Sequence, residues 1–155
     1  AVIGRKDIMA LYPPGSMTST HSASPLPVVC ALENLKIIQK EKLDERAATL
    51  GEILIPALER IQQKHPNLLG CVQGKGLVAG IQVVKPGSKA PNPELALKIN
   101  VACYQKGLLM FAPVGIGGEC LKISPPLVIE EEALRESITV FEQAIDEVIA
   151  NEPTA

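Results

Sequence analysis

The chain has 155 residues, a length that suits one ordinary domain or a piece of a larger protein. Its net charge of -2 comes without a basic cluster or interleaved aromatic residues, which argues against a nucleic-acid-binding surface. No apolar run reaches the roughly 18 residues of a membrane span, and the first residues lack the pattern of a signal peptide. We therefore expect a cytoplasmic protein that does not bind membranes.

The first part of the chain predicts a strand, a turn-rich stretch and a helix. Residues 1–4 are apolar and indicate a strand, followed by a helical turn. A strand that starts at residue 1 has no preceding loop, so we expect the sequence to be part of a longer one. Residues 12–25 are rich in turn formers and small hydroxyl residues. Pro25 or Pro27 suits the first turn of a helix, with Ser24 or a neighbour as its N-cap.

The middle of the chain predicts a long helix and then a hairpin. Apolar residues recur at helical spacing over residues 43–64, and Pro56 lies inside that helix, where a kink is expected. Short apolar runs at 71–72 and 77–84 indicate two strands. The glycine-containing residues 74–76 between them predict a hairpin-like connection.

The last part of the chain predicts two more helices and two more strands. Asn92-Pro93-Glu94 is a helix start signal, and Gly107 marks the end of that helix. The final helix begins at three acidic residues, 130–132, which suit a helix N-terminus. The glycine-rich residues 115–118 predict a tight turn with positive φ between the two strands. The strands themselves are predicted over 108–112 and 120–123. This order of elements predicts an α/β chain with helices on one face of a small mixed or antiparallel sheet.

The cysteines and histidines predict no metal site. The four cysteines form no CxxC pair, and the two histidines stand at spacings that complete no cluster of zinc ligands. We predict that the cysteines are buried free thiols. The residues concerned are Cys30, Cys71, Cys103, Cys120, His21 and His65.

A run of hydroxyl residues precedes the first long helix. It covers residues 18–25, and hydroxyl groups together with backbone amides at a helix N-terminus favour an anion. The alternative is ordinary helix capping. Both interpretations stay open on composition alone.

Lys122 is the second candidate binding residue. In a strand it alternates with the apolar Leu121 and Ile123, so it is expected to face away from the core. The prolines at 125–126 predict a rigid exit from the strand. A cation held there suits a carboxylate ligand, and an ordinary surface lysine is the alternative.

Four segments together resemble one known family. Residues 1–5 resemble the strand after that family's cofactor lysine, and 20–26 resemble its Thr-aromatic-Gly-Gly-Asn-Pro-Leu stretch. Residues 74–81 are similar to the hairpin of its small domain, and 122–129 to its Arg-x-x-Pro-Pro-Leu motif. The family is the class III pyridoxal-phosphate aminotransferases, which includes 4-aminobutyrate and ornithine aminotransferases and dialkylglycine decarboxylase. The resemblance is collinear and covers essentially the whole chain.

The resemblance implies a fold and an assembly. The chain is expected to be the C-terminal portion of a fold type I transferase that depends on pyridoxal 5'-phosphate (PLP), with helices packed on a small, mostly antiparallel sheet. Residues 1–38 are expected to end the large cofactor-binding domain, and residues 39–155 to form the C-terminal small domain. The complete chain is expected to form a homodimer.

The resemblance also implies roles for three residues. Thr20, with Ser19 beside it, matches the threonine that binds the cofactor phosphate of the partner subunit. Lys122 stands where the family has an arginine that binds the substrate carboxylate. Arginine grips a carboxylate with a planar fork, whereas lysine offers a mobile point charge. The Schiff-base lysine belongs before residue 1, so no catalytic residue is assigned in this chain.

The expected activity is the transfer of an amino group between an amino acid or ω-amine and a 2-oxo acid. The complete enzyme is expected to perform it, and this chain alone is expected to be inactive. Two alternatives stay open. One is a PLP-dependent decarboxylase or aminomutase of the same family, and the other is a non-catalytic dimerisation module.

Overall fold

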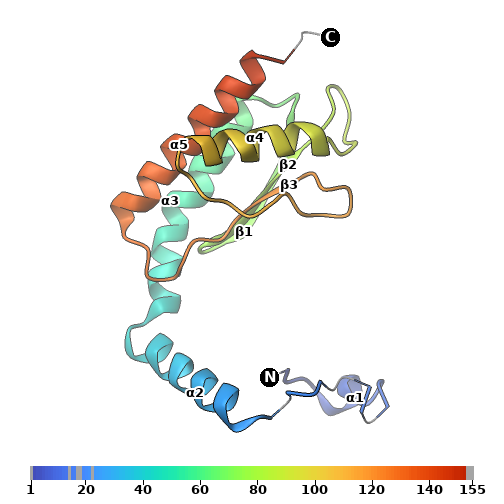
Figure 1. The fold of residues 1–155 in the computed structure, drawn as a ribbon, viewed down its shortest axis with the longest axis vertical. Coiled ribbons are helices and arrows are strands. Elements are labelled where there is room, and N and C mark those ends of the chain that lie inside the picture. Colours follow the sequence, from blue (N-terminus) through green and yellow to red (C-terminus); the bar gives the residue numbers. More distant parts are fainter. Residues whose placement is uncertain (1, 14, 17–18, 22, 153–155) are drawn as a thin grey trace. The chain divides into compact units, whose positions relative to one another are not determined.

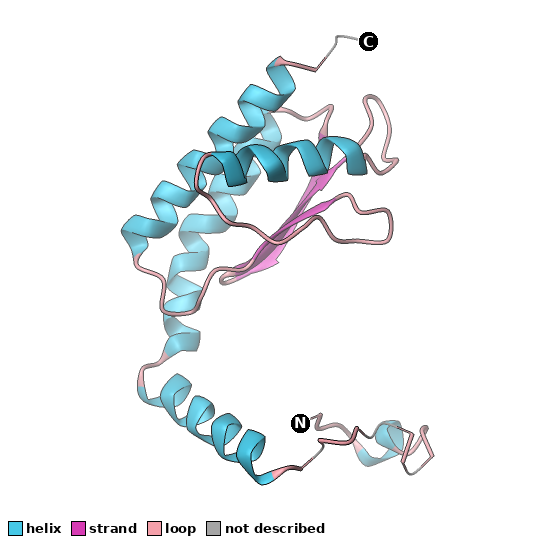
Figure 2. Cartoon of the chain, viewed as in Figure 1, coloured by secondary structure: helices cyan, strands magenta, loops and turns pink. Residues whose placement is uncertain are grey.

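The computed structural model describes residues 2–13, 15–16, 19–21 and 23–152, and the chain divides into two compact units. Unit 1 is Ala1–Glu41 and unit 2 is Lys42–Ala155. Figure 1 labels the helices and strands of both units, and Figure 2 colours them by type. The assignment of residues 1–38 and 39–155 to a large and a small domain stays a prediction.

Unit 1 contains two helices, α1 at Lys6–Met9 and α2 at Pro25–Lys40. Pro25 starts α2 as predicted, and Ser24 is its N-cap, although the Ser24 side chain makes no capping hydrogen bond. None of the α2 residues, all of which the structure describes, is buried. Its apolar side chains therefore face outward from the helix without cover from this unit.

The strand predicted at residues 1–4 is wrong where it can be checked. Residue 1 lies outside the described residues, and residues 2–4 have no regular secondary structure. A strand exists through hydrogen bonds to a neighbouring strand. No described residue pairs with this segment. Its apolar composition alone is therefore not sufficient to make it a strand.

Unit 2 is a three-stranded antiparallel sheet with three helices. The order of strands is β1-β2-β3, with Ile81 opposite Leu121 and Gly80 opposite Lys122. Helices α3 and α4 pack on the sheet, and α5 packs on both of them, as the ribbon shows (Figure 1). The elements are α3 Leu43–Lys64, β1 Leu69–Lys75, β2 Val78–Val83, α4 Pro93–Gln105, β3 Cys120–Ile123 and α5 Glu131–Ala150.

One face of the sheet forms the core. Ile81 and Leu121 are fully buried against the helices, together with Leu54, Leu58 and Ile145. Successive residues of a strand point to opposite faces, so Gly80 and Lys122 lie on the other face. The fold class predicted from the sequence, α/β with helices on a small antiparallel sheet, is confirmed.

The helix boundaries of unit 2 follow their sequence signals. α3 covers the predicted residues 43–64, with Pro56 inside it. The Asn92 side chain accepts a hydrogen bond from the Leu95 backbone N–H at 3.2 Å and caps α4. Gly107 follows α4 with a φ of +85°, a conformation that favours glycine. Glu130 is the N-cap residue of α5, so that helix also begins as predicted.

Two strand predictions need correction. β1 extends to Lys75, so Gly74 and Lys75 belong to the strand and the turn lies at Gly76-Leu77. Residues 108–112 form no strand. The Asn100 side chain donates a hydrogen bond to the Phe111 carbonyl at 2.7 Å, and this side-chain contact takes the place of a strand neighbour.

The prediction of buried thiols is correct for one cysteine. Cys103 is fully buried in the core, Cys120 is half-buried, and Cys30 and Cys71 are exposed. Cys30 lies on the unburied helix α2, and Cys71 lies within β1 at an exposed position beside Gln82. A free thiol is buried only where its position on the helix or strand faces the core.

Candidate functional site

Lys122 faces away from the core, as predicted. It is half-buried on β3, next to the fully buried Leu121 and opposite Gly80 of β2. Its ammonium nitrogen lies 4.9 Å from the centre of the Phe111 ring. This distance is typical of a cation–π contact. In the described part of the chain, no carboxylate forms an ion pair with Lys122.

A cavity of about 570 Å³ lies beside Lys122 within unit 2. Its walls are mainly apolar and come from α3, α5 and the segments on both sides of β3, including Phe111, Pro125 and Phe141. Lys122 is the charged group among the residues that line it. A cavity of this size with few polar groups is typical of a small-molecule site. The arrangement suits a ligand that carries a carboxylate and an apolar portion.

Ser19 and Thr20 lie in unit 1, in the segment before α2, and both are exposed. The neighbouring Thr18 and Ser22, which were also part of the predicted anion-binding run, lie outside the described residues. Ser19 and Thr20 thus lie on the surface of their unit.

The start of α2 supplies few amide donors. Pro25 and Pro27 have no backbone N–H, and the Val28 N–H already donates to the Ser24 carbonyl at 3.2 Å. Leu26 is left as the amide donor of the first turn. Ser24 makes no side-chain cap, and its neighbour Ser22 lies outside the described residues, so helix capping and anion binding both stay open as explanations of the hydroxyl residues. An anion site here depends mainly on side-chain hydroxyls.

The backbone before α2 adopts a conformation that favours glycine. Ala23 has a φ of +58°, in the left-handed region. A non-glycine residue in this region carries roughly 1–2 kcal/mol of strain. The family stretch that residues 20–26 resemble has glycine at this position.

The site residues fall into two groups, each described within its own unit. Ser19 and Thr20 belong to unit 1, and Lys122 belongs to unit 2. Sequence reasoning missed Phe111, because it was assigned to a strand. The loop that brings its ring to Lys122 has no sequence signature, so only the structure reveals the contact.

The remaining titratable groups have structural roles. Burial raises the pKa of the Cys103 thiol to about 11, so this thiol is protonated at neutral pH and is not a nucleophile. Across α3 and α5, Arg60 pairs with Glu142 at 2.8 Å, and His65 lies 2.6 Å from Asp146. The hydrogen bond from Arg60 lowers the pKa of the Glu142 carboxyl. These pairs join the C-terminal end of α3 to α5 and lie outside the residues that line the cavity.

The described residues contain neither a cluster of metal ligands nor a helix that could span a membrane. No group of three or more cysteine, histidine or acidic side chains lies close enough to hold a metal ion. No helix in that part of the chain has both the length and the apolar content that crossing a membrane requires.

Comparisons with known proteins identify the family. The pattern of the class III aminotransferases (Aminotransferase class-III) matches residues 1–145. The chain is 34% identical to an alanine/serine racemase of Pyrococcus horikoshii, over 96% of this chain and 30% of the relative. It is 33% identical to a 4-aminobutyrate aminotransferase of Escherichia coli, over 94% of this chain and 34% of the relative.

Solved structures agree with the sequence comparison. The structure of an acetylornithine aminotransferase from Elizabethkingia anophelis is similar with a TM-score of 0.70 and 33% identity, over 91% of this chain and 33% of that one. The chain spans about a third of the length of the curated relatives it matches. A family match over nearly all residues, together with the same fold, leads to one conclusion. The chain belongs to the class III aminotransferase family.

Proposed function

We propose that this chain is the C-terminal part of a PLP-dependent class III aminotransferase. The complete enzyme moves an amino group between an amino acid or ω-amine and a 2-oxo acid. The observation that carries this proposal is that Lys122 is among the residues that line an apolar cavity of unit 2. By its motif, Lys122 corresponds to the arginine with which the family binds the substrate carboxylate. The chain's share of its relatives, about a third, supports its status as a part.

Unit 1 is proposed to end the large domain and unit 2 to form the small domain. The complete chain forms a homodimer, and Ser19 and Thr20 hold the phosphate of the PLP bound by the partner subunit. Their exposed hydroxyls and the left-handed Ala23 support this role. Bound PLP supplies the electron sink for the reaction. The lysine that attaches it is proposed to precede residue 1 in the complete enzyme.

Lys122 is proposed to orient the substrate. Its ammonium group donates hydrogen bonds to the substrate carboxylate, and the charge favours substrates that carry one. The apolar walls of the neighbouring cavity exclude water from that contact. Charge-assisted hydrogen bonds are stronger where water is excluded, so this arrangement stabilises the bound carboxylate.

The cofactor assignment is tested with Thr20→Ala in the complete enzyme. Loss of a hydrogen bond to a charged phosphate is expected to raise the dissociation constant for PLP roughly 10- to 100-fold, which corresponds to about 1.5–3 kcal/mol. PLP binding is measured by absorbance titration. Ser16→Ala is the control, because the Ser16 hydroxyl donates to the Pro13 carbonyl and not to the proposed ligand. Unchanged PLP affinity of Thr20→Ala would refute the phosphate role.

The substrate assignment is tested with Lys122→Ala. The KM for carboxylate-bearing substrates is expected to rise much more than the KM for simple amines, whereas Lys122→Arg is expected to keep the preference. Lys75→Ala, which removes an exposed lysine from β1, is the control. Equal effects of Lys122→Ala on both substrate classes would refute the role.

Product analysis separates the possible reactions. A transaminase consumes a 2-oxo acid for each amine converted, whereas a decarboxylase releases carbon dioxide and an aminomutase moves the amino group within one molecule. The similarity to an alanine/serine racemase makes chiral analysis of the product part of the same assay. Inversion of the amino acid without consumption of 2-oxo acid would contradict the proposed transamination.

A further inference from the structure

We infer that Phe111 is the positioning residue for Lys122, and that its ring holds the ammonium group where a substrate carboxylate binds. The inference rests on the proposed role of Lys122 in carboxylate binding and goes beyond it. It explains how a flexible lysine serves at a position where the family has a planar, pre-organised arginine.

Lys122 has few other restraints on its side chain. β3 is an edge strand, and the residue opposite Lys122 in the ladder is Gly80, which has no side chain to pack against the lysine stem. In the part of the chain that the structure describes, no acidic residue pairs with Lys122. The Phe111 ring, 4.9 Å from the ammonium nitrogen, is a contact that the described structure provides for the charge.

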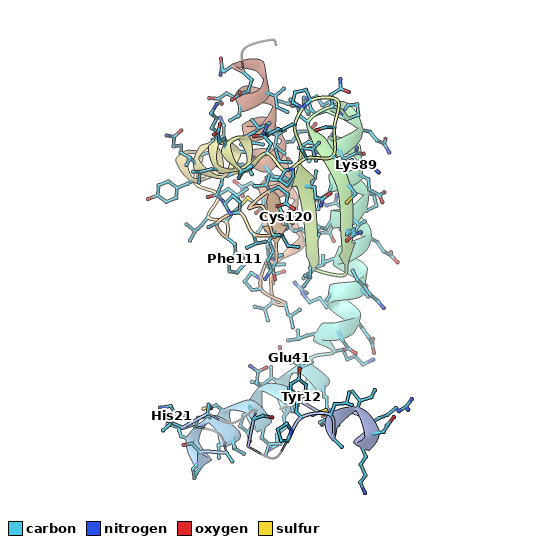
Figure 3. All side chains as sticks on the ribbon, turned by 90° about the vertical axis from the view of Figure 1, so that its right-hand side faces the viewer. Tyr12, His21, Glu41, Lys89, Phe111 and Cys120 are labelled. Carbon is cyan, nitrogen blue, oxygen red and sulfur yellow. The ribbon has the colours of Figure 1, made fainter. Side chains whose placement is uncertain are left out.

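The position of Phe111 is set from outside β3. The Asn100 side chain on α4 donates a hydrogen bond to the Phe111 carbonyl at 2.7 Å, and the Leu108 N–H donates to the Cys103 carbonyl at 2.9 Å. These two bonds tie the segment to α4, which packs on the core. Phe111 is 53% exposed, so one face of its ring is open to the cation. Figure 3 labels Phe111 and also Cys120, the first residue of β3, on unit 2.

An aromatic ring restrains a cation without neutralising it. A carboxylate in the same place would satisfy the charge of Lys122 and would compete with the substrate. The face of the Phe111 ring attracts the ammonium group on one side and leaves N–H donors free on the other. Both Phe111 and Lys122 are among the residues that line the apolar cavity. Loss of the Phe111 ring is therefore expected to weaken the binding of carboxylate-bearing substrates more than that of substrates without a carboxylate, which lose only an apolar wall contact.

The kinetic test compares Phe111→Leu and Phe111→Trp with wild type in the complete enzyme. Phe111→Leu is expected to raise the KM for a carboxylate-bearing substrate about two- to fivefold more than the KM for a simple amine. Phe111→Trp keeps an aromatic face and is expected to restore the wild-type KM. Tyr104→Leu, the same type of change at an exposed position on α4, is the control. In the Lys122→Ala background, Phe111→Leu is expected to have no further effect on the preference for carboxylate-bearing substrates over simple amines.

A second measurement does not require enzymatic activity. Lysines of the complete protein are converted to ¹³C-dimethyl-lysine, and the Lys122 signal is assigned by its loss in Lys122→Arg. The ring current of Phe111 is expected to shift that signal upfield, and Phe111→Leu is expected to remove the shift. Butyrate, used as the carboxylate probe, is expected to perturb the signal with an affinity two- to fivefold lower in Phe111→Leu.

The possible failures are distinguishable. An unshifted Lys122 signal in the wild type, or a shift that survives in Phe111→Leu, would overturn the inference whether or not the enzyme transaminates. Independent, additive effects of Phe111→Leu and Lys122→Ala on KM would also overturn it. Absence of transamination together with a ring-shifted Lys122 signal that responds to butyrate would instead reject the proposed reaction and leave the role of Phe111 standing.

Discussion

Gly51→Ala tests the closest approach between α3 and the β1–β2 hairpin. Gly51 is buried in α3, and a Cβ atom added there would lie 2.6 Å from the Gly76 Cα and 2.9 Å from the Gly76 carbonyl oxygen. Both atoms belong to backbone, so no side chain can swing away to make room. Gly76 itself has a φ of +58° in the hairpin turn, which limits how that backbone can move.

Two opposing effects determine how much Gly51→Ala changes the free energy of unfolding. Alanine is favoured over glycine inside a helix by about 1 kcal/mol, which stabilises the variant. Overpacking of a filled core costs about 1–3 kcal/mol, and a clash with rigid backbone belongs near the upper end. We therefore expect Gly51→Ala to lower the free energy of unfolding by about 1–2 kcal/mol.

The assay is urea unfolding followed by circular dichroism at the helix band, because the sequence has no tryptophan for fluorescence. Thr49→Ala is the control on the same helix. Thr49 is exposed and bonds the Glu45 carbonyl within its own helix, so its removal is expected to be neutral or slightly stabilising. A Gly51→Ala variant as stable as wild type would show that α3 and the hairpin are not in close backbone contact.

Three further changes test the packing of unit 2. Asn92→Ala removes the side-chain cap of α4 and is expected to lower the free energy of unfolding by about 1 kcal/mol in the same urea assay. Glu142 has its pKa lowered by the hydrogen bond from Arg60, so the pair contributes stability at neutral pH and loses it as the pH falls below the ordinary carboxyl range. Glu142→Gln is accordingly expected to unfold more easily than wild type at pH 7, by up to about 1 kcal/mol, and to match it near pH 3, as measured by thermal unfolding across that range. Cys103 is expected to resist iodoacetamide at pH 8 in the folded protein, because burial raises the pKa of its thiol to about 11. The exposed Cys71 is expected to react. Mass spectrometry of the labelled peptides distinguishes the two.

The helices were the most predictable part of the fold. The stripe over 43–64 and the Asn92-Pro93-Glu94 start signal both describe helices that the structure contains, with the same first residues. Their signals are local, because the capping side chain, the proline at the first position and the apolar repeat all act within a few residues. The outward orientation of Lys122 was predictable for the same reason, since alternation in a strand depends on its immediate neighbours.

Strands and contacts between distant segments were less predictable. The apolar residues 2–4 and 108–112 read as strands but have no neighbouring strand among the described residues, and hydrogen bonds to a neighbour are what make a strand. Cys71 occupies an exposed position of β1 beside Gln82, which its residue type does not reveal. Each of these errors concerns a contact between segments that are distant in the sequence.

The amino-acid sequence by itself determined the family resemblance, the helices with their caps, and the candidates Ser19, Thr20 and Lys122, because each depends on residue order over a short stretch. Only the tertiary structure decided that β3 is a sheet edge with Gly80 opposite Lys122 and that a cavity opens beside it. The hydrogen bond from Asn100 to the Phe111 carbonyl and the 4.9 Å approach of the Phe111 ring to the Lys122 ammonium are also visible only in the structure. These features arise where separate elements meet, and the packing that brings such elements together leaves no local pattern in the sequence.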